Sequence, residues 1–183
     1  MVKSLVATAA VLAVVSLTSV DAHSRMTAPK PNSPINDSPS GTIDAYKALK
    51  EPEGMHFNWS PADNNAAYHV AFAAQTKYKS LRDLIYANFR SDGGASKECG
   101  QSAMTGTPQA LPNFVEYETG FTRSHEGPCE VCTRPRQPGC PMTSPNAFGA
   151  KRLQSFWLAL HSQDWQAYIS CASLTGKRLL RGE

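Results

Sequence analysis

The chain lacks the features that would direct it to a membrane interior or to nucleic acid. Beyond an apolar run at residues 5–20, no stretch is long and apolar enough to cross a bilayer. It has no run of interleaved basic and aromatic residues, which argues against nucleic-acid binding. It also has no internal repeats, no linker and no second C-x-x-C motif. These absences favour one ordinary domain without a repeat architecture or a paired-knuckle zinc site.

The first 22 residues have the three parts of a secretory signal peptide. Lys3 supplies the positive charge, residues 5–20 the apolar segment, and Val20 and Ala22 the small residues at positions −3 and −1 of the cleavage site. The alternative is an uncleaved membrane anchor. It is disfavoured because the apolar run is marginal for a span and no basic stop-transfer pattern follows it. We therefore expect a secreted protein.

The composition fits one domain over residues 23–176, followed by a basic tail over residues 177–183. Hydrophobic residues make up 41% and aromatic residues 9% of the 183-residue chain, enough to build a core. The net charge of +3 suits an anionic partner such as an acidic polysaccharide. We expect a monomer that binds neither nucleic acid nor membrane. Asn36 and Asn58 begin N-glycosylation sequons.

The five cysteines of an exported protein indicate two disulfides with one cysteine left over. Cys129 and Cys132 form a C-x-x-C motif, a spacing found in both redox sites and zinc sites. No second such motif accompanies it and a proline-rich segment follows, so structural disulfide chemistry is the favoured interpretation.

The hydrophobic pattern predicts short helices in the first half of the domain and strands in the second. Prolines make residues 23–41 and 133–150 extended loops. Helices are predicted at residues 43–50 and, as two segments with three- and four-residue apolar spacing, within 65–89. Strands are predicted at residues 114–117, 121–131, 153–160 and 165–174, the last two rich in alternating apolar and aromatic residues.

Cleavage after Ala22 would leave His23 as the first residue, with an α-amine and an imidazole as two nitrogen donors. Adding His125 gives three neutral nitrogen donors, and Tyr168 gives a weak oxygen donor, a set that selects copper under the Irving–Williams order. The α-amine must lose a proton to bind, and its ordinary pKa near 8 allows a metal to displace that proton. His69 has no partner at i+4 and is interpreted as a packing or surface histidine.

Three segments carry a family resemblance: HSRMTAP at the expected mature end, SHEGPCE, and FWLALHSQDWQAYISCASL. Together they resemble the lytic polysaccharide monooxygenases, and they are most similar to the pectin-active family described in oomycetes, auxiliary activity family seventeen. The fungal cellulose-active family shares the skeleton S-H-x-G-P, L-H-S and Q-x-Y. The resemblance covers the mature N-terminus and most of residues 97–174.

The resemblance implies an all-β core, an immunoglobulin-like or fibronectin-like β-sandwich with long loops and short helical insertions. It assigns His23 and His125 to a copper-binding histidine brace with Tyr168 as the axial ligand. Gln166 and His161 would lie just outside the metal and act in catalysis beside it. Gln166 and Tyr168 stand two apart on a predicted strand and so share a face.

The resemblance also implies a disulfide between Cys99 and Cys171. The segment between the GPCE and WLAL motifs is shorter than in family members, and it leaves an odd cysteine. We expect Cys132 to pair with Cys140 and Cys129 to be left over.

The implied activity is copper-dependent oxidative cleavage of plant cell-wall polysaccharide, preferentially homogalacturonan, with O2 or H2O2 and an external electron donor. Arg25 and Arg123 are candidates for attracting galacturonate carboxylates, with two solvated arginines as the alternative. Two other functions stay open: a non-enzymatic copper-binding protein with the same ligands, and a disulfide-stapled secreted module without a metal.

Overall fold

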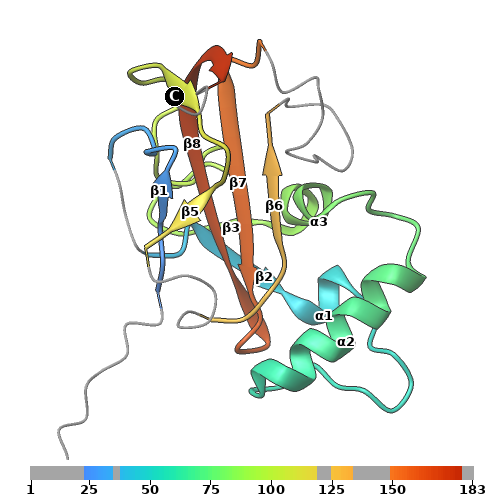
Figure 1. The fold of residues 1–183 in the computed structure, drawn as a ribbon. Coiled ribbons are helices and arrows are strands. Elements are labelled where there is room, and N and C mark those ends of the chain that lie inside the picture. The colour runs from blue at the N-terminus through green and yellow to red at the C-terminus, as the bar shows by residue number, and fades with distance from the viewer. Residues whose placement is uncertain (1–22, 35–37, 119–124, 134–148, 179–183) are drawn as a thin grey trace, which may run out of the picture.

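A six-stranded sheet organises the protein, and its two longest strands are neighbours (Figure 1). The computed structural model describes residues 23–34, 38–118, 125–133 and 149–178. In the large sheet the order is β3-β2-β8-β7-β6, with β4 paired in parallel to β8, and β1 and β5 form a separate two-stranded sheet. The strands are β1 (Met26–Ala28), β2 (Gly41–Asp44), β3 (Arg90–Ser91), β4 (Gln109–Leu111), β5 (Glu116–Tyr117), β6 (Cys129–Cys132), β7 (Arg152–Ala159) and β8 (Asp164–Arg178).

The large sheet is covered on both faces. One face carries Phe156 and Leu158 of β7 and Ile169 of β8, which belong to a core shared with the helices. The opposite face carries Trp157 and Tyr168 and lies toward β1 and β5 (Figure 1). Because side chains alternate along a strand, the same two strands serve a helical layer and a small β layer. Over the described residues the result is a mostly β protein with three short helices and two sheets, which are antiparallel except where β4 pairs with β8.

The helices are α1 (Ala45–Ala48), α2 (Pro61–Ala74) and α3 (Leu81–Asn88). Ser60 and Ser80 are the N-caps of α2 and α3, and each side chain accepts a hydrogen bond from a backbone N–H of the first turn. The two helices predicted within residues 65–89 are therefore confirmed.

The helix predicted at residues 43–50 is only partly correct. Ile43 pairs with Trp165 in the sheet, and the helix begins after the N-cap Asp44. Sheet pairing of the β-branched residues Thr42 and Ile43 prevails over the local helical pattern.

The strands predicted at residues 153–160 and 165–174 are confirmed as β7 and β8. The strand β8 continues to Arg178, into the segment predicted as a tail. The strand predicted at 114–117 is reduced to β5, and that predicted at 121–131 is wrong over 125–128 because β6 begins at Cys129. Four of the short strands, β1, β2, β3 and β4, were not predicted. Such short strands have too little sequence pattern of their own and exist through their partners.

Cys99 and Cys171 form a disulfide across 72 residues, as the resemblance implies. Cys132 is also disulfide-bonded, but Cys140 lies outside the described residues, so that pairing stays a prediction. Cys129 is a free, exposed thiol. Residues three apart on a strand point to opposite faces, so the C-x-x-C of β6 does not act as a dithiol pair. Within the described ranges no helix is long and apolar enough to span a membrane.

Candidate metal centre

Three histidine rings from distant parts of the chain meet at one end of the large sheet. The ring centroids of His23 and His125 are 5.7 Å apart with an interplanar angle of 65°. His125 and His161 stack with centroids 3.7 Å apart. His23 is the first described residue and precedes β1, His125 precedes β6, and His161 lies in the turn between β7 and β8. We call these three residues the histidine cluster.

Gly127 brings His125 to this position because it permits a close backbone approach. A Cβ atom at Gly127 would lie 1.8 Å from the carbonyl oxygen of Leu158, so only glycine fits. On either side of it, the N–H of Leu158 donates to Pro128 O at 3.0 Å and the N–H of Leu160 donates to Glu126 O at 2.9 Å. These contacts lay the segment of His125 along the end of β7, beside the turn that carries His161.

Tyr168 packs beside the histidine cluster. Its ring centroid lies 6.0 Å from that of His23, and its ring stacks on Trp157 with centroids 4.4 Å apart. Its hydroxyl donates a hydrogen bond of 2.9 Å to Oε1 of Gln166, which shares the sheet face. The side chain is 7% exposed, so the phenol is held between an indole, an amide and an imidazole.

Burial and mutual proximity favour the neutral form of the imidazoles. Desolvation first, and then the neighbouring His161 and His23, together lower the pKa of His125 to about 4. The pKa of His161 is also lowered, by desolvation first and then by His23. Neutral imidazole is the form that binds a metal. In the described part of the chain, the buried Nδ1 of His161 has no hydrogen-bond partner.

Asn64 holds the turn that carries His161, a role that was not predicted from the sequence. Asn64 is fully buried at the N-terminal end of α2. Its Nδ2 donates to Leu160 O at 2.8 Å and to Ser162 O at 3.2 Å, the carbonyls that flank His161. Apolar periodicity does not distinguish a buried, hydrogen-bonded asparagine from an exposed one, because the periodic pattern records only apolar positions.

The geometry fits one metal ion between His23 and His125. A metal bound about 2 Å from an imidazole nitrogen lies about 3 Å from the ring centroid, so two ligating rings on opposite sides have centroids up to about 6 Å apart. The observed 5.7 Å is within that limit. Among the described residues no group of three or more His, Cys, Asp or Glu is arranged to hold a metal. A histidine brace would require only two imidazoles, because the α-amine that cleavage before His23 would expose is the expected third nitrogen donor.

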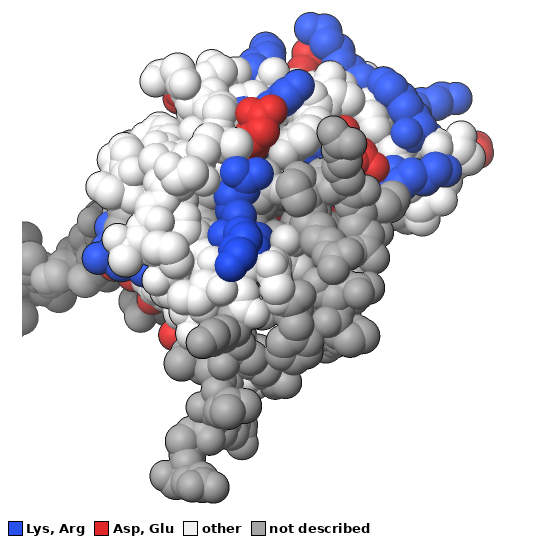
Figure 2. Space-filling model, turned by 90° about the horizontal axis from the view of Figure 1, so that it is seen from above, with Lys and Arg blue, Asp and Glu red and all other residues white. Residues whose placement is uncertain are grey.

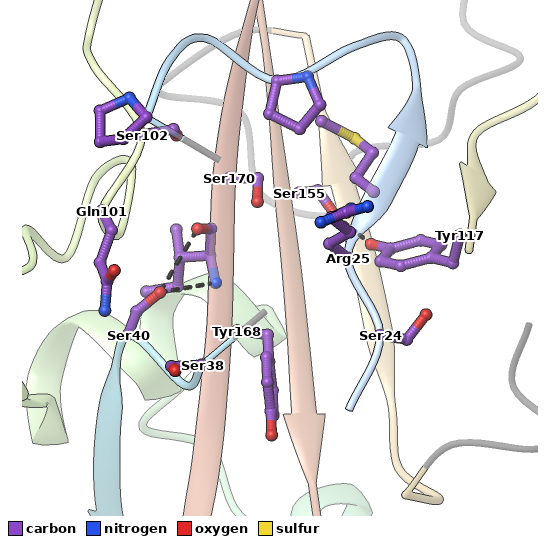
Figure 3. A pocket seen from close by; sticks show the side chains of 14 residues that line it. Ser24, Arg25, Ser38, Ser40, Gln101, Ser102, Tyr117, Ser155, Tyr168 and Ser170 are labelled. Atoms are coloured by element: carbon purple, nitrogen blue, oxygen red, sulfur yellow. Dashed lines mark hydrogen bonds between the residues drawn. The ribbon is translucent and has the colours of Figure 1, made fainter. Parts of the chain in front are cut away.

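A small polar pocket adjoins Tyr168 on the side of β1 (Figure 3). Arg25 borders the pocket and its guanidinium is ion-paired with Glu118 at 2.8 Å, both groups partly exposed. Hydroxyl groups make up much of the lining, which suits water more than an apolar ligand. The serines that contribute are Ser24, Ser38, Ser40, Ser102, Ser155 and Ser170.

Of the remaining predicted residues, some are described by the structure and others are not. Arg123 and Asn36 lie outside the described residues. Asn58 precedes α2; its Oδ1 accepts a hydrogen bond of 2.6 Å from the N–H of Ser60. His69 is exposed on α2, as predicted for a surface histidine, with an edge contact to Tyr68. Basic side chains are visible on the end of the molecule seen in Figure 2, opposite the turn between β7 and β8.

Comparison with known proteins adds no family to this geometry. No protein-family model matches the sequence, and no curated protein or solved structure matches it. The functional interpretation therefore depends on the residues of the histidine cluster and its surroundings.

Proposed function

We propose that the protein, once cleaved before His23, binds one copper ion through a histidine brace and oxidatively cleaves plant cell-wall polysaccharide. The observation that carries this proposal is the 5.7 Å approach of the His23 and His125 rings, which come from distant parts of the chain. When bound, copper would supply one-electron redox chemistry with O2 or H2O2 and an external electron donor. The Cys99–Cys171 disulfide is of the kind that forms in oxidising compartments, which supports secretion.

The chain contributes ligands and a polar surrounding. His23, through its amine and ring, and His125 would hold the metal, with Tyr168 as a distant oxygen ligand. Gln166 orients the Tyr168 hydroxyl through the hydrogen bond between them. His161 stacks on His125, and its Nδ1 has no hydrogen-bond partner among the described residues; both observations support a role beside the metal rather than in the protein core.

The arrangement of the two sheets supports a sandwich fold. The small sheet of β1 and β5 packs over one face of the large sheet, where Tyr117 meets Trp157 edge to face at 6.4 Å. Two facing antiparallel sheets are what an immunoglobulin-like or fibronectin-like sandwich requires. We propose that this arrangement is such a sandwich with helices added on its outer face.

Pectin is the proposed substrate class, and its recognition would involve Arg25. The guanidinium of Arg25 already pairs with Glu118, so a galacturonate carboxylate has to compete with that partner. The mildly basic net charge of +3 favours rather than opposes an anionic polysaccharide.

The decisive experiment starts from the secreted protein. N-terminal sequencing should give His23 as the first residue, and copper titration with electron paramagnetic resonance should show one Cu(II) with nitrogen ligands. His125→Ala should abolish this spectrum, whereas His56→Ala, a side chain 74% exposed, should not. One extra residue placed before His23 should also abolish it, because the amine ligand is then an amide.

Activity separates the enzyme from a copper-binding protein with the same ligands. The copper-loaded protein is incubated with ascorbate and pectin, cellulose or chitin, and products are read by mass spectrometry. Oxidised oligosaccharides from pectin support the proposal. Tight copper binding without oxidised products from any of the three would support a non-enzymatic copper-binding protein instead.

A further inference from the structure

Met104 is the most exposed methionine that the structure describes, and its sulfur has two defined neighbours. The residue is 44% exposed, whereas Met26 is 1% exposed and Met55 is partly buried against the core. Sδ of Met104 lies 3.1 Å from Sγ of the disulfide-bonded Cys99 and 3.9 Å from Nη1 of Arg152. A thioether sulfur is open to two-electron oxidation, and exposure to solvent favours that reaction.

Arg152 is a strong hydrogen-bond donor next to a weak acceptor. Its Nε is buried and has no hydrogen-bond partner among the described residues. Its Nη1 points at the thioether sulfur of Met104, which accepts hydrogen bonds poorly. The backbone of Arg152 pairs with Ser173 in the sheet, so the side chain extends from a fixed position. A guanidinium keeps its charge at ordinary pH and binds best to an oxygen acceptor.

The backbone on both sides of Met104 is held by hydrogen bonds to other segments. Before it, the carbonyl of Ala103 accepts a bond of 2.8 Å from Nδ2 of Asn32. After it, the N–H of Gly106 donates to Oγ of Ser173 at 2.8 Å. The sulfur therefore belongs to a fixed loop and lies beside a donor that is already in place, which reduces the entropy lost when the two groups bond.

We propose that Met104 is a site of reversible oxidation by hydrogen peroxide and that Arg152 stabilises the sulfoxide that forms. The sulfur attacks one peroxide oxygen, the O–O bond breaks and an S–O bond forms. The sulfur loses two electrons, and the leaving hydroxide takes the proton of the transferred oxygen and departs as water. A thiol-dependent sulfoxide reductase returns two electrons and releases the oxygen as water. Because no step requires copper, this inference does not rest on the proposed function.

The distance between Met104 and Arg152 suits the oxidised form. An oxygen on the sulfur that accepts a bent hydrogen bond of about 2.8 Å leaves sulfur and nitrogen about 4 Å apart, close to the observed 3.9 Å. Oxidation of methionine commonly disrupts packing because it adds a polar group. Here the added oxygen gains a charged donor in place of a weak contact, so Met104 can consume peroxide without loss of the fold.

Peptide mass spectrometry after treatment with hydrogen peroxide tests the site. The protein is produced in a bacterial periplasm, where no N-glycan is added, and is held with a chelator so that trace metal catalyses no other oxidation. The Met104 peptide should gain one oxygen at least about fivefold faster than the peptide of the buried Met26. Methionine sulfoxide reductase should remove that oxygen. Equal rates for the two peptides, or an oxidised Met104 that the reductase does not restore, would overturn the inference.

Urea denaturation tests the role of Arg152. The oxidised wild type should have a urea midpoint equal to or above that of the reduced protein. In Arg152→Leu, oxidation should lower the midpoint by about 0.5 M or more, because the sulfoxide has lost its donor. Lys151→Leu is the matched control; it removes a neighbouring cation, whose Nζ donates to Thr175 O at 3.3 Å, and should respond to oxidation as the wild type does. Peroxide-treated Met104→Leu reports the effect of oxidation elsewhere in the chain. An equal fall in the wild type and in Arg152→Leu would refute the role of Arg152.

Met104→Gln provides a second measurement that needs no peroxide. Its amide oxygen takes the place of the sulfoxide oxygen, whereas Met104→Leu keeps an apolar side chain of similar size. Met104→Gln should have the higher urea midpoint of the two, and this order should disappear when Arg152→Leu is added. The first comparison does not require Arg152→Leu to fold. A higher midpoint for Met104→Leu would show that Arg152 does not stabilise an oxygen acceptor at this position, and the inference would fail.

Discussion

Asn64 is predicted to be the residue whose loss most damages the support of the histidine cluster. Nδ2 of Asn64 donates to the two carbonyls that flank His161 and to the carbonyl of Asn58, and Oδ1 of Asn64 accepts from the N–H of Asn58. Asn64→Ala removes these bonds at a fully buried position. It leaves the carbonyl of Leu160 and the N–H of Asn58 without these partners.

The expected cost follows from those contacts. A net hydrogen bond contributes about 1 kcal/mol, and a buried polar group left without a partner costs about 1 to 3 kcal/mol. Asn64→Ala should therefore lower the free energy of unfolding by about 2 to 4 kcal/mol. Asn65→Ala is the matched control, since Asn65 makes a solvent-exposed bond to Pro61 O and should cost about 0.5 kcal/mol or less.

Asn64→Asp tests the direction of the hydrogen bonds. The new carboxyl group keeps the shape but turns a donor to Leu160 and Ser162 into an acceptor facing two carbonyl oxygens. Its folded-state pKa should be raised above that of the unfolded chain, so the folded state binds the extra proton. The variant should therefore lose stability as pH rises from about 4.

Urea denaturation of the metal-free proteins at several pH values measures these effects. A free energy of unfolding for Asn64→Ala within about 0.5 kcal/mol of wild type, close to that of Asn65→Ala, would refute the reasoning. So would an Asn64→Asp variant as stable as the wild type at neutral pH.

Three further outcomes follow from the same structure. Gly127→Ala should lower the free energy of unfolding by about 2 to 3 kcal/mol, because its Cβ would meet the carbonyl oxygen of Leu158; denaturation measures it, and a neutral variant contradicts the close approach. Replacing Cys99 and Cys171 together by serine should cost about 4 kcal/mol for a 72-residue separation, and a loss of less than about 1 kcal/mol in denaturation would count against it. The metal-free protein should lose stability as pH falls toward 4, because His125 has its ordinary pKa in the unfolded chain and is protonated there while the folded form stays neutral. His125→Gln should reduce this dependence of the free energy of unfolding on pH, and an unchanged dependence would disprove the cause.

The parts of the fold that were predictable are those with a strong local pattern. The strands β7 and β8 were visible from their dense apolar and aromatic residues, and α2 and α3 from three- and four-residue spacing. The segment at residues 43–50 shows the limit of this approach. Thr42 and Ile43 become part of a strand because β8 offers them a partner, and no local pattern records a partner that is distant in sequence.

The candidate site also has residues that could be predicted from the sequence and residues that could not. His23, His125, Gln166 and Tyr168 were identifiable from residue type and motif spacing, and two of them share a face because strand residues two apart must. The contributions of Asn64 were not identifiable. Its role depends on which carbonyls lie within reach of a buried amide, and that is known only after α2 packs against the end of the sheet.

The sequence by itself determined the types of donor group and the local elements. The donors are a histidine at the expected cleavage site, two histidines within short motifs, and a tyrosine on a predicted strand. These follow from side-chain chemistry and from the two-residue period of strands. Only the tertiary structure decided that the rings of His23 and His125 approach to 5.7 Å and that His161 stacks on His125. Such proximity depends on the close backbone approach at Gly127 and on the packing of buried groups such as Asn64, which no stretch of sequence contains alone.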